Sequence, residues 1–195
     1  MKVIRHSDRD FADQIAGLTE KTSLFDAEIE QRTRAILEAV RSRGDDALLE
    51  FTERFDGAKL TADQLPVTRA ELMTASLQAD ESLRSAITEA ERNVASFARK
   101  SRRRNWQSSN SHGAIVGEKF DPFQRVGVYI PGGTAPLVST AIMTITLAKA
   151  AGCPEIVVCT PCGKDGSINP ALLFAARAAG ATEIFRAGGA QAIAA

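Results

Sequence analysis

Short apolar runs alternate with helical patterns after residue 124, and this alternation constrains the fold more than any other feature of the sequence. The runs at 126–130, 156–160 and 183–186 favour β-strands, and glycine or proline follows each of them closely. Helical patterns at 142–151 and 171–179 lie between the runs. Strands that alternate with helices pair in parallel, because each connection crosses back over the sheet. The sequence therefore predicts an α/β fold whose parallel sheet is covered by helices on both faces.

Residues 1–111 have a different character. They hold 18 of the 24 Lys and Arg and 19 of the 24 Asp and Glu, but only 3 of the 14 glycines. Their apolar residues recur at helical spacing in three segments, near 29–40, 47–55 and 83–97. The front of the chain is therefore predicted to be mostly helical.

The last residues, 188–195, predict a turn that opens a further helix, and no strand follows it. A parallel sheet of three strands also leaves a long apolar edge, which a complete domain pairs or covers. We therefore expect 125–195 to be the first half of a Rossmann-like cofactor domain that stops incomplete, with apolar surface exposed unless a partner covers it. Before it we expect a helical N-terminal region, 1–124, with a short β-bearing connector near 111–120.

The composition limits the class of protein and its location. Hydrophobic residues make up 44% of the chain, which is enough for a core, and the 24 basic and 24 acidic side chains cancel. No segment has the apolar core of a signal peptide or the roughly 18 apolar residues of a membrane span. We therefore expect a globular, cytoplasmic protein with no nucleic-acid or membrane partner.

Two glycine-containing turns, 131–136 and 188–191, follow the first and third predicted strands. Ligands of open parallel sheets bind beyond the carboxyl ends of the strands, where glycine lets the backbone approach a phosphate or ribose. A helix that starts after such a turn adds unpaired N–H groups. Neither turn matches the G-x-G-x-x-G or P-loop motif, so a nucleotide site and a plain sharp turn both remain open.

Two further motifs have competing interpretations. Cys159 and Cys162 form a C-x-x-C, as in redox centres or half of a zinc site, but a loop follows instead of the helix that would lower a thiol pKa. We interpret the spacing as coincidence and expect all three cysteines, including Cys153, to be reduced. The basic cluster 99–104 with Trp106 could bind nucleic acid, but a solvated helix end or a subunit contact is favoured, because cations stabilise a helix C-terminus.

Four blocks of the sequence carry a family resemblance. They are VGVYIPGGTAP at 126–136, GGAQAIAA at 188–195, RGDDALLE at 43–50 and RFDG at 54–57. Together they closely resemble the histidinol dehydrogenase family. The resemblance implies an NAD- and zinc-dependent homodimer of histidine biosynthesis, which oxidises L-histidinol to L-histidine in two steps with two NAD molecules.

The resemblance also implies that Tyr129 and Gln191 contact the cofactor. A tyrosine can stack or form hydrogen bonds, and a glutamine near a helix start can bind ribose or phosphate oxygens. Packing at the strand end is the alternative role for Tyr129. The family's zinc ligands and its Glu-His proton-transfer pair lie further along than this chain extends, so we predict no catalytic and no metal-binding residue in it. His6 and His112 are far apart in the sequence and are expected on the surface.

The resemblance leaves the function of the chain itself open. We expect it to be the N-terminal portion of a histidinol dehydrogenase and to be inactive alone. A related zinc- and NAD-dependent dehydrogenase of another small alcohol, or a non-catalytic nucleotide-binding fragment, would carry the same residues. Residues that select the substrate are expected outside this chain, so its sequence does not separate these alternatives.

Overall fold

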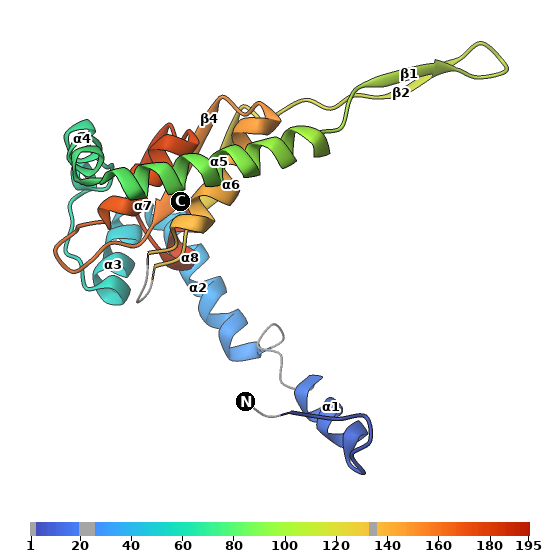
Figure 1. Cartoon of the computed structure of the whole chain (residues 1–195). Helices are drawn as coiled ribbons and strands as arrows, with labels where there is room; N and C mark the ends of the chain where they lie inside the picture. The colour runs from blue at the N-terminus through green and yellow to red at the C-terminus, as the bar shows by residue number, and fades with distance from the viewer. Residues whose placement is uncertain (1–2, 20–25, 133–135) are drawn as a thin grey trace.

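The structure is a computed structural model that describes residues 3–19, 26–132 and 136–195. Front helices, a projecting β-hairpin and an α/β part follow one another along the chain (Figure 1). Within the described residues, no helix combines the length and apolar character that a membrane crossing requires.

The elements before residue 124 are helices followed by the hairpin. They are α1 (Phe11–Thr19), α2 (Ala27–Arg43), α3 (Asp45–Asp56), the 3-10 helix η2 (Ala62–Gln64), α4 (Arg69–Gln78), α5 (Glu81–Ser101), β1 (Trp106–Ser109) and β2 (Ile115–Glu118). The α/β part consists of β3 (Arg125–Tyr129), α6 (Val138–Ala151), β4 (Glu155–Thr160), α7 (Pro170–Ala179), β5 (Glu183–Arg186) and α8 (Gly189–Ala194). The strands and helices predicted after residue 124 are present, which confirms the α/β fold class.

Capping side chains set where the front helices begin. Asp26 accepts from two N–H groups in the first turn of α2, at 2.9 and 3.3 Å, and Asp80 accepts from one in α5, at 2.7 Å. The structure adds α1 and α4, which the sequence analysis did not predict. A capping box fixes the start of α4, because Thr68 and Glu71 each accept a hydrogen bond from the other's backbone N–H.

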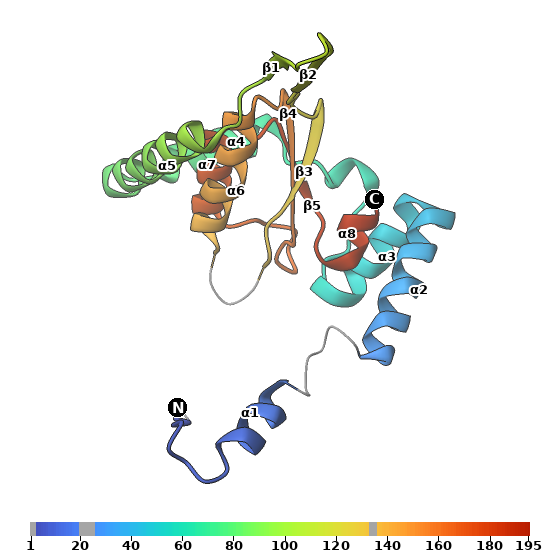
Figure 2. The ribbon, with the colours of Figure 1, turned by 90° about the vertical axis from the view of Figure 1, so that its right-hand side faces the viewer.

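One face of the parallel sheet holds the main core of the described chain. Strands β3, β4 and β5 pair in that order, so each crossover helix leads to a neighbouring strand. Ile130, Val158 and Ile184 point to this face, are at most 4% exposed, and pack against α6 and α7. Figure 2 shows both helices on this side of the sheet. The face is closed because both connections cross on the same side.

The opposite face is covered only in part by the described residues. Helices α3 and α8 lie on this side (Figure 2), where Leu48 and Ala192 belong to the same apolar cluster as Phe185 of β5. An open cavity of about 650 Å³, here called the sheet-face cavity, is lined by Gly127 and Val157 among others. The prediction of helices on both faces therefore holds fully for one face only, since α3 and α8 leave part of the other uncovered.

The outer edge of β5 is paired by a segment of the front part. The N–H of Val67 donates to the carbonyl of Ile184, and the N–H of Arg186 donates to the carbonyl of Leu65, each at 2.8 Å. Pro66 lies opposite β5 in an antiparallel bridge. The long free edge expected from the sequence is thus closed on this side by residues that precede the sheet by a long stretch of chain.

The side chain of Arg186 ties three segments together. It is 7% exposed, and its Nε donates to the carbonyl of Gly166 at 2.7 Å. Its Nη1 donates to the carbonyls of Gln64 and Pro66, at 2.9 and 2.8 Å, and its Nη2 donates to the carboxylate of Glu71. One guanidinium therefore fixes the loop after β4, the segment after η2 and helix α4 against the end of β5.

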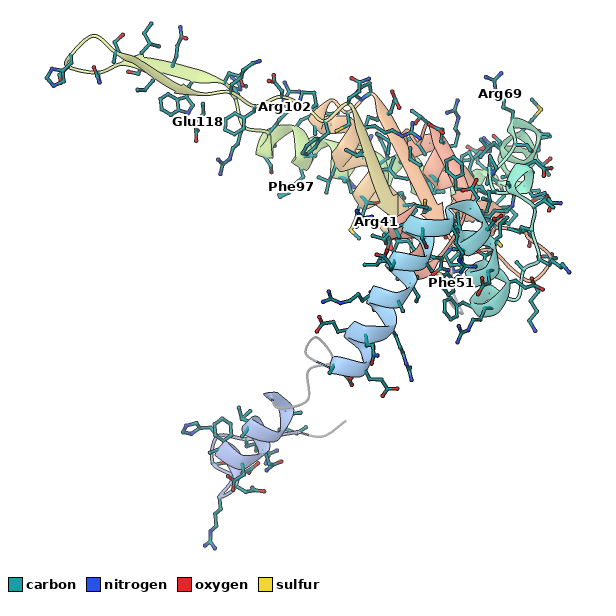
Figure 3. All side chains as sticks on the ribbon, turned by 180° about the vertical axis from the view of Figure 1, so that it is seen from behind. Arg41, Phe51, Arg69, Phe97, Arg102 and Glu118 are labelled. Atoms are coloured by element: carbon teal, nitrogen blue, oxygen red, sulfur yellow. The ribbon has the colours of Figure 1, made fainter. Side chains whose placement is uncertain are left out.

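The hairpin formed by β1 and β2 projects from the rest of the molecule (Figure 1). Every residue of both strands is exposed, and the indole Nε1 of Trp106 donates to the carboxylate of Glu118 at 2.7 Å. Figure 3 shows Glu118 on this arm, beyond Arg102 at the end of α5. The hairpin begins at Trp106, before the range 111–120 in which the sequence predicted a short β-bearing connector. A domain boundary after residue 124 stays a prediction.

The environment of Arg186 predicts a large loss of stability when its charge is removed. In Arg186→Met, three carbonyls and a carboxylate lose their donor, and we expect the free energy of unfolding to fall by about 3–5 kcal/mol. Arg125→Met is the matched control, because Arg125 contacts Glu155 and Glu183 at 2.6 Å each at the other end of the sheet but is 49% exposed. Urea denaturation should show a loss of at most about 1 kcal/mol for it. Equal losses in the two variants would contradict this assignment.

Glu71 makes part of the stability depend on pH. Burial raises the pKa of its carboxyl, but hydrogen bonds from Arg186 and Thr68 lower it, and the net pKa lies below its ordinary value of 4.5. A carboxyl with a lowered pKa stabilises the fold above the unfolded pKa and loses this contribution as the pH falls through the folded pKa. Urea midpoints should therefore fall below about pH 4.5 more steeply in the parent than in Glu71→Gln. Parallel pH curves would show that this contact contributes nothing.

Candidate functional site

The carboxyl ends of β3, β4 and β5 meet at one edge of the sheet, as parallel pairing requires. A cavity of about 580 Å³ opens there, here called the strand-end cavity. The residues that line it are Asp56, Tyr129, Pro131, Gly132, Pro136, Leu137, Thr160, Pro161, Cys162, Gly163, Ser167, Ile168, Asn169, Leu172 and Gly189. Part of the predicted turn 131–136, namely 133–135, lies outside the described residues.

Glycines allow the loops at this edge to pack closely around Pro161. A Cβ at Gly132 would lie 2.3 Å from Cγ of Pro161, and a Cβ at Gly188 would lie 2.7 Å from its Cβ. Both distances are shorter than carbon atoms can approach, so neither position accepts a side chain without movement. The turns after β3 and β5 therefore converge on the proline that follows β4. At this part of the edge the backbone itself packs against Pro161, because the two glycines have no side chains.

Tyr129 spans the edge from the end of β3 to the start of α8. Its hydroxyl accepts a hydrogen bond from the N–H of Gly189 at 3.1 Å. It lines both the strand-end cavity and the sheet-face cavity. The N–H of Gly189 is a helix-start donor with no intrahelical partner, so the phenol oxygen replaces a capping side chain. The structure thus gives Tyr129 a structural contact at the cavity wall, and its role as a cofactor contact stays a prediction.

Gln191 is not brought to the cavity wall beside Tyr129. Its side chain is 1% exposed, and within the described residues neither its Nε2 nor its Oε1 has a hydrogen-bond partner. The amide lies against Gly189, where an added Cβ would be 2.5 Å from Oε1. Leaving a buried amide unpaired costs about 1–3 kcal/mol. Gln191 therefore keeps unused donor and acceptor capacity two residues after Gly189, which lines the cavity, and its predicted cofactor contact stays a prediction.

Two oxygen atoms at the strand-end cavity are also unpaired within the described residues. They are Oγ1 of Thr160, at the end of β4, and Oδ2 of Asp56, at the end of α3. Burial raises the pKa of the Asp56 carboxyl. The sequence predicts no role for Asp56, and only the block RFDG at 54–57 marks its position. The structure places it across the cavity from residues that come much later in the chain.

The two cysteines of the C-x-x-C motif line different cavities. Cys159 lines the sheet-face cavity and Cys162 lines the strand-end cavity, and all three cysteines are free. Burial raises the pKa of both thiols, and the charge of Asp56 raises that of Cys162 further. A raised pKa leaves less thiolate and a less reactive sulfur. The interpretation of the spacing as coincidence agrees with this geometry.

Zinc does not fit the described part of the chain. Among its residues, no three His, Cys, Asp or Glu side chains gather closely enough to hold a metal ion. His6 packs its ring against Phe11, with centroids 5.0 Å apart, and His112 lies in the hairpin turn.

The fold and the site are those of a Rossmann-like α/β protein with a glycine-lined cavity at the ends of its strands. A family model described as histidinol dehydrogenase matches residues 19–195, and the chain belongs to that family. The histidinol dehydrogenase of Symbiobacterium thermophilum is 46% identical over 176 residues, which cover 90% of this chain and 40% of that protein. That of Bacteroides thetaiotaomicron is 43% identical over 195 residues, covering 100% of this chain and 44% of that protein.

The comparison with solved structures also finds a histidinol dehydrogenase. The crystal structure of histidinol dehydrogenase from Elizabethkingia anophelis superposes with a TM-score of 0.79 at 34% identity, over 85% of this chain and 38% of that one. The family resemblance predicted from the four sequence blocks is therefore confirmed. The chain spans about two fifths of the length of these relatives.

The packing around Pro161 predicts a selective rescue. Gly132→Ala and Gly188→Ala should each lower the free energy of unfolding by about 1–3 kcal/mol through overpacking. Adding Pro161→Ala removes the proline Cγ with which the new Cβ at position 132 collides, and the nearest remaining atom of residue 161 is its Cβ, at 3.3 Å. The same change keeps the Cβ and Cα of residue 161, which lie 2.7 and 3.2 Å from the new Cβ at position 188. Double-mutant cycles in urea should thus show favourable coupling for position 132 and little for 188. Equal coupling at both positions would refute the arrangement.

Proposed function

We propose that this chain is the N-terminal portion of a histidinol dehydrogenase and that its strand-end cavity forms part of the NAD site. The whole protein would then oxidise L-histidinol to L-histidine with two NAD molecules, in histidine biosynthesis. The observation that carries the proposal is the cavity itself, since it lies where open α/β sheets bind nucleotides and its wall includes Gly132, Gly163 and Gly189. The reaction is inferred from the family to which the chain belongs.

The residues at the cavity fit a dinucleotide. Gly132 and Gly189 are exposed and line the cavity, so the backbone there carries no side chain that would keep a phosphate or ribose group away. The unpaired hydroxyl of Thr160 lines the cavity and offers a donor and an acceptor to a polar ligand. The amide of Gln191 is also unpaired, but it is buried behind the wall and would reach a ligand only after the turn at Gly189 moves. Bound NAD would accept hydride from the alcohol. In this proposal Tyr129 and Gln191 bind and orient the cofactor, while Pro161 gives the cavity a rigid apolar wall.

The zinc and proton-transfer groups of the reaction would come from residues other than those described. We therefore propose that this chain binds nucleotide without turnover when alone, and that a cytoplasmic homodimer of the whole protein is the active form. Exposed apolar side chains on the hairpin support association: Trp106 is 51% exposed, Ile115 71% and Val116 50%. A dehydrogenase of another small alcohol would use the same strand-end cavity and differ in residues outside this chain.

The test is a titration of the ¹⁵N-labelled chain with NAD, followed by NMR. We expect amide shifts in the loops that end β3, β4 and β5, with an affinity that Tyr129→Ala lowers about tenfold through loss of ring contact and hydrogen bond. Phe123→Ala is the control, because Phe123 is 76% exposed and lies outside the strand-end cavity.

Two results would contradict the proposal. One is an absence of shifts in these loops with NAD at about 10 mM, which would detect even millimolar affinity. The other is NADH formation at a normal enzymatic rate when the chain alone receives L-histidinol and zinc, since that would place the chemistry on these residues.

A further inference from the structure

Rossmann-like domains bind the ribose of a dinucleotide through an acidic residue that follows the second strand. In this chain the second strand of the parallel sheet is β4, which ends at Thr160, and the residues that follow, 161–163, include no acid. The next acid, Asp165, is not among the lining residues of the strand-end cavity. Its Oδ1 already accepts from the backbone N–H and the hydroxyl of Ser167, at 3.0 and 2.7 Å.

Asp56 brings a carboxylate to this place from outside the α/β part. It is the last residue of α3, and among the described residues it is the only acid that lines the strand-end cavity. The following residue, Gly57, packs against the loop after β4, where an added Cβ would lie 3.2 Å from Cγ of Lys164. The charge of Asp56 also acts on the thiol of Cys162. The carboxylate is therefore close to the end of β4.

The fold itself does not use this carboxylate fully. Within the described residues, Oδ2 of Asp56 is buried and has no hydrogen-bond partner. Burial raises the pKa of the group, so its charged form is disfavoured by the folded protein. A buried, unpaired acceptor lowers stability, and a ligand that donates to it would remove this penalty. A carboxylate can accept hydrogen bonds from two adjacent hydroxyl groups of a ligand at the same time.

We propose that Asp56 accepts hydrogen bonds from the ribose hydroxyls of the dinucleotide in the strand-end cavity and selects NAD over NADP. This inference rests on the proposed function, because it takes that cavity as the dinucleotide site. A carboxylate favours a free 2′-hydroxyl by hydrogen bonding and disfavours a 2′-phosphate by charge repulsion. The acid that the second strand lacks is thus supplied by a helix of the front part.

The experiment compares the parent chain with Asp56→Asn and with Glu53→Gln as the control. Glu53 is an exposed acid on the same helix and does not line the cavity. NMR titrations with NAD and with NADP give both affinities for each variant. We expect Asp56→Asn to weaken NAD binding about tenfold, and to move the NAD-to-NADP affinity ratio about tenfold or more toward NADP. Glu53→Gln should change neither.

Urea denaturation separates this role from a structural one. A carboxyl with a raised pKa penalises the folded state once the pH exceeds the unfolded pKa of 3.8, so Asp56→Asn should keep or raise the urea midpoint at neutral pH. The ratio of NAD to NADP affinity is measured on one sample and does not depend on the fraction folded. A lower midpoint with an unchanged ratio would assign Asp56 a structural role and overturn the inference.

The outcomes also separate the inference from the proposed function. NAD shifts in the strand-end loops with equal affinity and an equal NAD-to-NADP ratio in Asp56→Asn would overturn the inference and leave the proposed function standing. An absence of NAD shifts in the parent at about 10 mM would overturn both.

Discussion

The arrangement of this chain depends on the guanidinium of Arg186. It lies at the end of β5, where it bonds to carbonyls from the loop after β4 and from the segment after η2, and to the carboxylate of Glu71. Because a planar guanidinium with several donors fixes both distance and direction, these contacts hold the segment from η2 to the start of α4 at one position on the sheet. The front part also contributes Asp56 to the wall of the strand-end cavity, so the shape of the cavity depends on how that part is attached to the sheet.

The sequence predicted those elements whose signals are local. The apolar runs of β3, β4 and β5 and the helical patterns of α5, α6 and α7 all lie within a few residues of the structure that they specify. Helix α4 was missed because its apolar residues form no clear stripe, and only the Thr68 to Glu71 capping box marks it. The hairpin start at Trp106 was missed because both strands are exposed and so lack an alternation of buried and exposed side chains.

The sequence predicted where the turns of the site lie, but not how its individual side chains are placed. The glycine turns follow from the strand pattern, and the family blocks pointed to Tyr129. The burial of Gln191 depends on how the turn at Gly189 places the first residues of α8, and a sequence pattern does not contain this. The approach of Asp56 depends on packing between α3 and the loop after β4, segments that are far apart along the chain. Long-range contacts of this kind are set by the whole fold.

The contact between Tyr129 and Gly189 fixes the direction of a proton. A phenol oxygen carries one proton and can accept hydrogen bonds, and here one acceptor position is filled by a backbone N–H. The hydroxyl proton must then point away from that N–H. Tyr129 is consequently a hydrogen-bond donor whose direction is fixed before any ligand binds. An oxygen acceptor beside it, such as a phosphate, would form a hydrogen bond without the cost of orienting that donor.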